Sequence, residues 1–255
     1  LIFTFFILGA FFPSIRILLI GYDSSSTPLE YLISAIPELY LLFISSYYFI
    51  LVWKEKISFK FNLVDKFVLL FLCFNVIIGA LLADNIELSL YGFRMSYLPI
   101  LFYFFIRFIP LKKDQLIQLI DKIFLLFTFI GFLGIVLYFV FFDFMIEMIH
   151  RTGSEVAEYF IPRMTSIFWS PVIFGTFMSI TFCYFYYKLF QNNPSKKHYL
   201  FIAITCFCTF FSISRGSILI MIMGFIITPI LYKKWKPFIY VLPILILSFL
   251  ILGYN

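Results

Sequence analysis

Long apolar runs alternate with short polar segments along the chain, and this pattern predicts a bundle of membrane-spanning helices. A helix needs about 20 apolar residues to cross the hydrocarbon core of a bilayer. Nine runs are candidate spans: 1–21, 32–53, 67–82, 88–108, 117–142, 171–190, 199–213, 217–231 and 238–252. The alternating polar and apolar positions of a membrane β-barrel are absent from the sequence. We therefore predict an all-α, polytopic integral membrane protein, with residues 1–255 forming one transmembrane helical domain.

The composition supports the same class. Hydrophobic residues make up 63% of the chain and charged residues 13%, and the mean hydropathy is +1.05. A soluble domain of this size has no interior large enough to bury so much apolar surface. The composition therefore argues against a soluble globular protein.

The lysines predict which side of the membrane each loop faces. All thirteen fall in four short loops, 54–66, 112–122, 188–197 and 233–236, and pairs of predicted spans separate these loops. Lysine and arginine keep loops on the cytoplasmic side, so we predict a multi-pass protein of the cell inner (cytoplasmic) membrane. With the flanks included, the inner side has fourteen basic residues and four acids, and the outer side has five basic residues and nine acids. The net charge of +6 is thus an inner-face signal beside membrane lipid and requires no nucleic acid.

Five of the six arginines lie outside the lysine loops, at positions 16, 94, 151, 163 and 215. These arginines are predicted to face outward or to lie in the outer half of the membrane. A guanidinium is a permanently charged fork that fits phosphate and carboxylate groups. Arg16, and Arg94 taken singly, fit a side chain that reaches lipid phosphate, whereas Arg215 favours a bound anionic ligand.

The predicted hairpin between Lys197 and Lys233 is the reason to expect an anionic ligand at Arg215. Both ends are predicted inside, and only about 33 mostly apolar residues are available for two crossings. Arms of 15 or 16 residues reach roughly 22 to 24 Å, short of the ~30 Å core. The turn at residues 214–216 is therefore expected below the outer surface, with Arg215 buried and with Ser214, Gly216 and Ser217 supporting the turn. An anionic head group would compensate the buried charge.

Residues 143–170 form the longest predicted extracytoplasmic loop. Its first part, 144–149, is apolar enough to lie flat at the membrane interface. At its end, Ser170 followed by Pro171 indicates the N-cap and first residue of the sixth span. Glu147, Glu155 and Glu158 are possible general bases, although a solvated acidic loop is the simpler interpretation. The four cysteines lie in apolar runs and indicate neither a disulfide framework nor a metal site.

Two short motifs resemble a known family. The segment Arg163-Met-Thr-Ser-Ile-Phe-Trp-Ser-Pro171-Val-Ile-Phe-Gly175 is similar to the Arg, Phe, Pro, Gly pattern of the O-antigen ligase and polymerase superfamily. The segment Ser214-Arg215-Gly216-Ser217 resembles the Ser-Arg-Gly motif of the same proteins, one helix pair later. In that family a large extracytoplasmic loop with a functional histidine follows. We expect this chain to be a fragment, because Asn255 lies where that loop would begin.

The resemblance implies a metal-independent membrane glycosyltransferase. Such enzymes move a polyprenyl-diphosphate-linked oligosaccharide onto a glycan or lipid acceptor on the outer face, without a cofactor. For this chain the resemblance implies that Arg215 and Arg163 bind the diphosphate and that Arg94 assists. It also implies that the general base lies beyond Asn255. Polymerase and ligase differ only in the acceptor.

Two alternatives stay open on the sequence. A transporter or flippase for an anionic lipid-linked substrate also needs arginines in a membrane cavity, but it is expected to show matching halves and polar residues near the midplane. The chain has no such repeat. A membrane subunit without enzymatic activity is the other alternative.

Overall fold

The computed structural model describes residues 36–54, 62–82, 112–151, 163–168, 170–191 and 194–254, together with residues 3, 4, 7, 11, 104 and 107. These residues form eight α-helices and one 3-10 helix, and there is no strand in the part of the chain that is described. The predicted all-α class is thereby confirmed for this part.

The helices follow one another with short connections. In order they are α3 (Ile36–Lys54), α4 (Leu63–Leu82), α6 (Lys113–Phe139), α7 (Phe142–Arg151), the 3-10 helix η2 (Ser166–Phe168), α8 (Pro171–Lys188), α9 (Lys197–Phe211), α10 (Arg215–Tyr232) and α11 (Lys236–Tyr254). They belong to two compact units. Unit 1 comprises Leu1–Phe5 with Ser34–Leu116, and unit 2 comprises Phe6–Ile33 with Ile117–Asn255. The expectation of one helical domain stays a prediction.

Seven of the nine predicted spans coincide with a described helix, namely α3, α4, α6, α8, α9, α10 and α11. The other two, 1–21 and 88–108, lie largely outside the described residues. A count of nine spans is therefore not supported. Several helices begin two to four residues before the predicted span, because the apolar run marks only the hydrophobic part of a helix and polar residues continue it.

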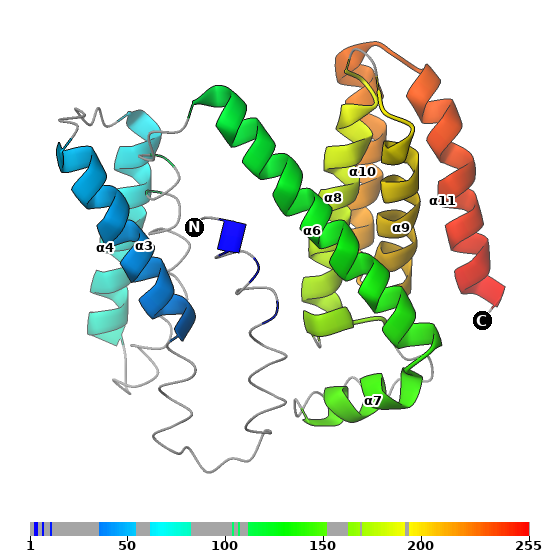
Figure 1. Ribbon diagram of the computed structural model, residues 1–255, viewed down its shortest axis with the longest axis horizontal. Helices are drawn as coiled ribbons and strands as arrows, with labels where there is room; N and C mark the ends of the chain where they lie inside the picture. Colours follow the sequence, from blue (N-terminus) through cyan, green and yellow to red (C-terminus); the bar gives the residue numbers. More distant parts are fainter. Residues whose placement is uncertain are drawn as a thin grey trace. The chain divides into compact units, whose positions relative to one another are not determined.

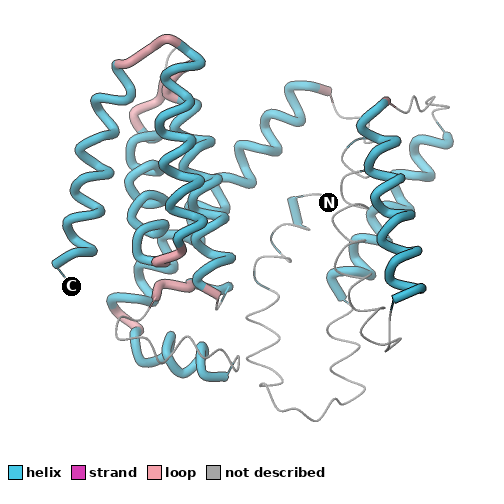
Figure 2. The backbone as a smooth tube through the Cα atoms, turned by 180° about the vertical axis from the view of Figure 1, so that it is seen from behind, coloured by secondary structure: helices cyan, strands magenta, loops and turns pink. Residues whose placement is uncertain are grey.

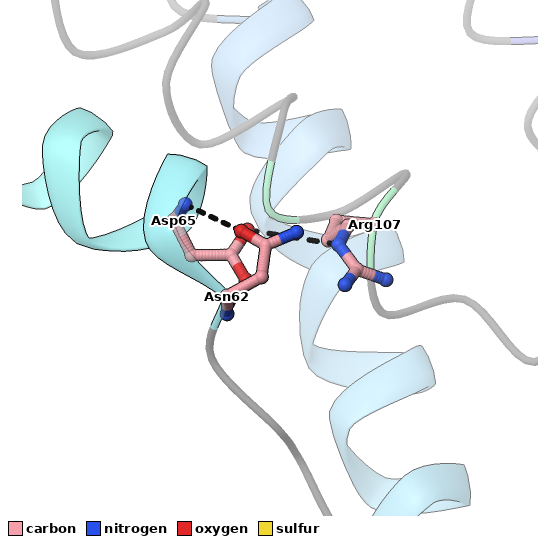
Figure 3. A network of polar contacts seen from close by, with 3 residues as sticks. All are labelled: Asn62, Asp65 and Arg107. Atoms are coloured by element: carbon pink, nitrogen blue, oxygen red, sulfur yellow. Dashed lines mark hydrogen bonds and ion pairs between the residues drawn. The ribbon is translucent and has the colours of Figure 1, made fainter.

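The start of α4 shows such a boundary in unit 1. The backbone N–H of Asn62 donates to Asp65 Oδ2 (2.7 Å), and the backbone N–H of Asp65 donates to Asn62 Oδ1 (2.8 Å; Figure 3). This reciprocal pair caps the first turn, so the helix begins at Leu63 rather than at Phe67. The buried Asp65 carboxylate also forms an ion pair with Arg107 (3.6 Å). Both residues come from segments that the sequence predicts on the inner side.

In unit 2, the helices α8, α9, α10 and α11 lie side by side (Figure 1). Helix α8 packs against α9 and α10, and α11 packs against α9. Their shared core is apolar and largely aromatic. It includes Phe182, Phe185 and Tyr186 from α8, Phe190 from the connection that follows α8, Ile202, Cys206 and Phe210 from α9, Met221 and Phe225 from α10, and Val241 and Leu245 from α11.

Helix α6 contacts this bundle through two glycines. A Cβ on Gly131 would lie 2.9 Å from Met178 Sδ, and a Cβ on Gly134 would lie 3.0 Å from Ser166 Cβ. The Cys208 thiol donates to the Gly131 carbonyl (3.3 Å). Small residues let the helix backbones approach closely, which is how helices associate where lipid removes the hydrophobic driving force.

The connections between the bundle helices lie at two opposite ends (Figure 2). Residues 212–214 and residues 163–168 are at one end, and the α8–α9 and α10–α11 connections are at the other. At the second end Lys188 pairs with Asp121 of α6 (2.9 Å) and Lys234 Nζ donates to the Phe190 carbonyl (3.1 Å). All four residues come from segments predicted on the inner side.

Two described helices, α6 and α10, are long and apolar enough to cross a membrane by length and composition. Helix α10 also leaves much of its apolar surface uncovered by the rest of the chain, with Leu219 61% exposed and Ile230 55% exposed. Water does not favour so large an apolar face. Both helices are therefore candidate membrane spans.

Candidate functional site

The turn between α9 and α10 differs from the one expected from the sequence. It consists of Ser212, Ile213 and Ser214, and Arg215 and Gly216 are the first two residues of α10. The predicted turn at residues 214–216 was wrong by two residues, because Ser214 has extended backbone angles and acts as the N-cap of α10. Ile213 adopts the left-handed conformation, with φ 49°. A β-branched residue is rarely found there, so the turn holds a strained backbone.

Four hydroxyl groups form a cluster at this turn. They belong to Thr176, Ser212, Ser214 and Ser217. Ser217 Oγ donates to Ser214 Oγ (2.9 Å) and lies 3.3 Å from Thr176 Oγ1. Ser212 Oγ donates to the Thr209 carbonyl (2.7 Å) and accepts from the Ser214 N–H (3.4 Å). The Ser214 side chain makes no cap bond to α10, and its own O–H is donated to no described residue. This hydroxyl and the first N–H groups of α10 are donors at the helix start.

Gly175 of α8 brings the first sequence motif against the second. A Cβ at this position would lie 2.3 Å from Ser212 Oγ and 2.8 Å from Ser217 Oγ. Real Cβ atoms do not approach other heavy atoms so closely, so a larger residue at position 175 would require the two serine side chains, or α8 and the turn, to move. The glycine that ends the first motif is therefore in direct contact with the serines that flank Arg215.

The segment that contains Arg163 is attached to the same end of the bundle. The Met164 N–H donates to the Phe211 carbonyl at the end of α9 (2.9 Å). Ser166 Oγ donates to the Ile130 carbonyl of α6 (2.8 Å), and Ser166 has φ 50°. These bonds hold residues 163–168 beside the last turn of α9. The turn 212–214, which precedes Arg215, follows directly.

Arg215 is not covered by the described part of the protein, and its expected depth in the membrane stays a prediction. It is the first residue of α10. Residues 159–255 contain eight basic residues and no aspartate or glutamate. No carboxylate of this long segment is thus available to neutralise Arg215.

The remaining predicted residues are distributed as follows. Ser214 and Ser217 are buried in the hydroxyl cluster, and Arg163 is half-buried. Gly216 is exposed, and a Cβ there would meet nothing within 4 Å, so this glycine is not required by packing. Arg94 and Arg16 lie outside the described residues. The structure therefore brings together the segments of Arg163 and Arg215, and the binding roles of all three predicted arginines stay predictions.

Part of the predicted extracytoplasmic loop 143–170 is helical. Helix α7 buries Met145, Met148 and Ile149 against α6 and exposes Asp143 and Glu147. The side of α7 with these three residues is thus covered by α6, and the expected position of 144–149 at a membrane interface stays a prediction. The predicted start of the next helix is confirmed, with Ser170 as N-cap and Pro171 in the first turn of α8.

The sequence did not reveal the roles of Thr176 and of the Met164 backbone. The sequence signal for the first was weak, because Thr176 is one of three serine and threonine residues in α8, with Ser179 and Thr181. Comparisons of the chain with protein-family models, with curated proteins and with solved structures find no match.

Proposed function

We propose that this chain belongs to a multi-pass protein of the cytoplasmic membrane that transfers or polymerises a polyprenyl-diphosphate-linked glycan on the outer face. The contact of Gly175 with Ser212 and Ser217 carries the proposal. It joins the two motifs on which the resemblance to the O-antigen ligase and polymerase superfamily rests. Nothing in generic helix packing requires two motifs 39 residues apart at their nearest ends, 175 and 214, to meet.

The chemistry needs a cation at the diphosphate. The acceptor hydroxyl attacks the anomeric carbon, the bond from that carbon to the phosphate oxygen breaks, and the leaving diphosphate takes the electron pair. Arg215, the Ser214 hydroxyl and the N–H groups at the start of α10 are suited to bind that anion and to stabilise its growing charge. Arg163 and Arg94 are proposed to assist. The proton of the attacking hydroxyl passes to a general base.

The nine-span arrangement is part of the proposal and has a direct test. Reporter fusions after Lys60, Lys113, Lys196 and Lys234 should report the cytoplasm, and fusions after Ser25, Asn85 and Glu155 should report the outer side, because lysine-rich loops stay inside. The contacts of Asp65 with Arg107 and of Lys188 with Asp121 agree with this assignment. One reversed reporter would contradict the arrangement.

The proposed reaction can be separated from transport in proteoliposomes. The natural protein that carries this chain is reconstituted with a polyprenyl-diphosphate-linked oligosaccharide and an acceptor glycan, and product length is measured beside accessibility of the lipid-linked glycan to an impermeant enzyme. A transferase yields a longer glycan or a glycosylated acceptor. Movement of the lipid-linked glycan between leaflets without any new glycosidic bond would instead establish the flippase alternative and refute our proposal.

A further inference from the structure

The end of the bundle opposite the turn 212–214 has a concentrated positive charge. Five lysines, which we call the lysine end, lie on the two connections there: Lys196, Lys197, Lys233, Lys234 and Lys236. All five are exposed. Lys234 Nζ donates to the carbonyl of the buried Phe190 (3.1 Å), which fastens the α10–α11 connection to the α8–α9 connection. The α8–α9 and α10–α11 connections, which are far apart in the sequence, thus lie at the same end of the bundle (Figure 2).

The charge of this surface is not neutralised within the described part of the chain. Residues 159–255 contain no acid, and the nearby Asp121 carboxylate is already paired with Lys188. Helices α9 and α11 begin here, and neither has an acid in its first turn. Burial, together with the Lys188 ammonium, lowers the pKa of His198, although Asp121 opposes this shift. This histidine lies just before the predicted span 199–213 and is neutral at pH 7, so the lysines supply the charge.

Exposed aromatic and aliphatic side chains adjoin the lysines. Trp235 stands between Lys234 and Lys236 and is 55% exposed, and Tyr240 is 62% exposed. Leu231 and Ile239 follow along α10 and α11 and are likewise exposed. Aromatic rings beside lysines, with apolar helix faces next to them, are the pattern of a membrane–water interface. An acidic protein or a nucleic acid would cover the lysines and leave the apolar faces in water.

We infer that the lysine end binds the headgroups of anionic phospholipids in the adjacent leaflet and holds them beside Trp235. The inference rests on the membrane embedding in the proposed function and does not depend on the transfer reaction. Each lysine near an anionic membrane surface strengthens the binding of a protein segment to that surface by about fivefold. A lipid site of this kind is therefore expected to prefer anionic over zwitterionic headgroups by at least that factor.

Fluorescence quenching of Trp235 tests the inference. The chain has three tryptophans, so Trp53→Phe with Trp169→Phe leaves Trp235 as the reporter. The full chain is reconstituted in mixtures of phosphatidylglycerol and phosphatidylcholine in which one lipid has brominated acyl chains. We expect brominated phosphatidylglycerol to quench with a relative binding constant about fivefold or more above that of phosphatidylcholine. The preference should shrink at high salt, because ions screen exposed charges.

Two matched variants locate the site. Lys233→Gln with Lys236→Gln should lower the preference by at least about fivefold. Lys112→Gln with Lys113→Gln removes the same charge from another segment and should leave the preference unchanged. Lys234 is kept because it joins the two connections. Equal quenching by both lipids, or a preference that Lys233→Gln with Lys236→Gln leaves unchanged, would overturn the lipid site while membrane embedding stands. Absence of quenching by either lipid would overturn the embedding as well.

Discussion

Replacing Arg215 by alanine should weaken binding of a polyprenyl diphosphate by roughly 30- to 150-fold, the equivalent of about 2 to 3 kcal/mol for a lost charge-assisted hydrogen bond. Arg215 is exposed at the start of α10, and residues 159–255 contain no acid that could pair with it. Binding is measured by titration of the detergent-purified protein, with the corresponding polyprenyl alcohol as the ligand without phosphate.

Two further variants show whether the shape of the guanidinium matters. Arg215→Lys keeps the charge but loses the two-pronged donor and should cost roughly tenfold in affinity. Lys233→Ala removes one exposed charge at the other end of α10 and should leave binding unchanged. Because Arg215 is exposed, its loss should change the free energy of unfolding by no more than about 0.5 kcal/mol. If Arg215→Ala binds the diphosphate as tightly as the unchanged protein, the clamp role is wrong.

Adding a single methyl group at Gly175 should destabilise the protein by about 2 to 3 kcal/mol. The new Cβ of Gly175→Ala would lie 2.3 Å from Ser212 Oγ and 2.8 Å from Ser217 Oγ, so α8 and the turn must separate or both serines must change rotamer. The free energy of unfolding in detergent, measured by chemical denaturation, checks the value. Because the contact of Gly175 with the serines supports the turn before Arg215, diphosphate binding should fall in the same variant.

A neighbouring glycine and a second substitution provide the controls. Gly216→Ala places a methyl group in open space in the first turn of α10 and should raise stability by about 0.5 to 1 kcal/mol, because alanine favours the helix. Ser212→Gly removes the atoms that Gly175→Ala would meet first. The double variant should therefore be more stable, by at least about 1 kcal/mol, than the sum of the two single effects predicts. Additive effects would contradict a direct clash.

Much of the secondary structure was predictable from the sequence. Seven spans correspond to described helices, because the length of an apolar run is a one-dimensional property that a helix must match to the bilayer. The start of α8 at Pro171 was predictable for a similar reason, since an N-cap serine and a following proline act locally. The start of α10 was misplaced, because a hydropathy boundary ignores the capping role of Ser214 and so moved Arg215 from the helix into the turn.

The sequence by itself determined the helical class, the positions of most helices and the distribution of charge between the loops. Only the tertiary structure decided which helix faces meet. Helix α8 is apolar on nearly every side, and hydrophobic periodicity therefore does not show that Gly175 faces the serines of the α9–α10 turn. The same holds for the lysine end, where the bond from Lys234 to the Phe190 carbonyl joins two loops that are distant in sequence. Such contacts depend on shape and on hydrogen-bond geometry between segments, and an apolar sequence does not specify either one locally.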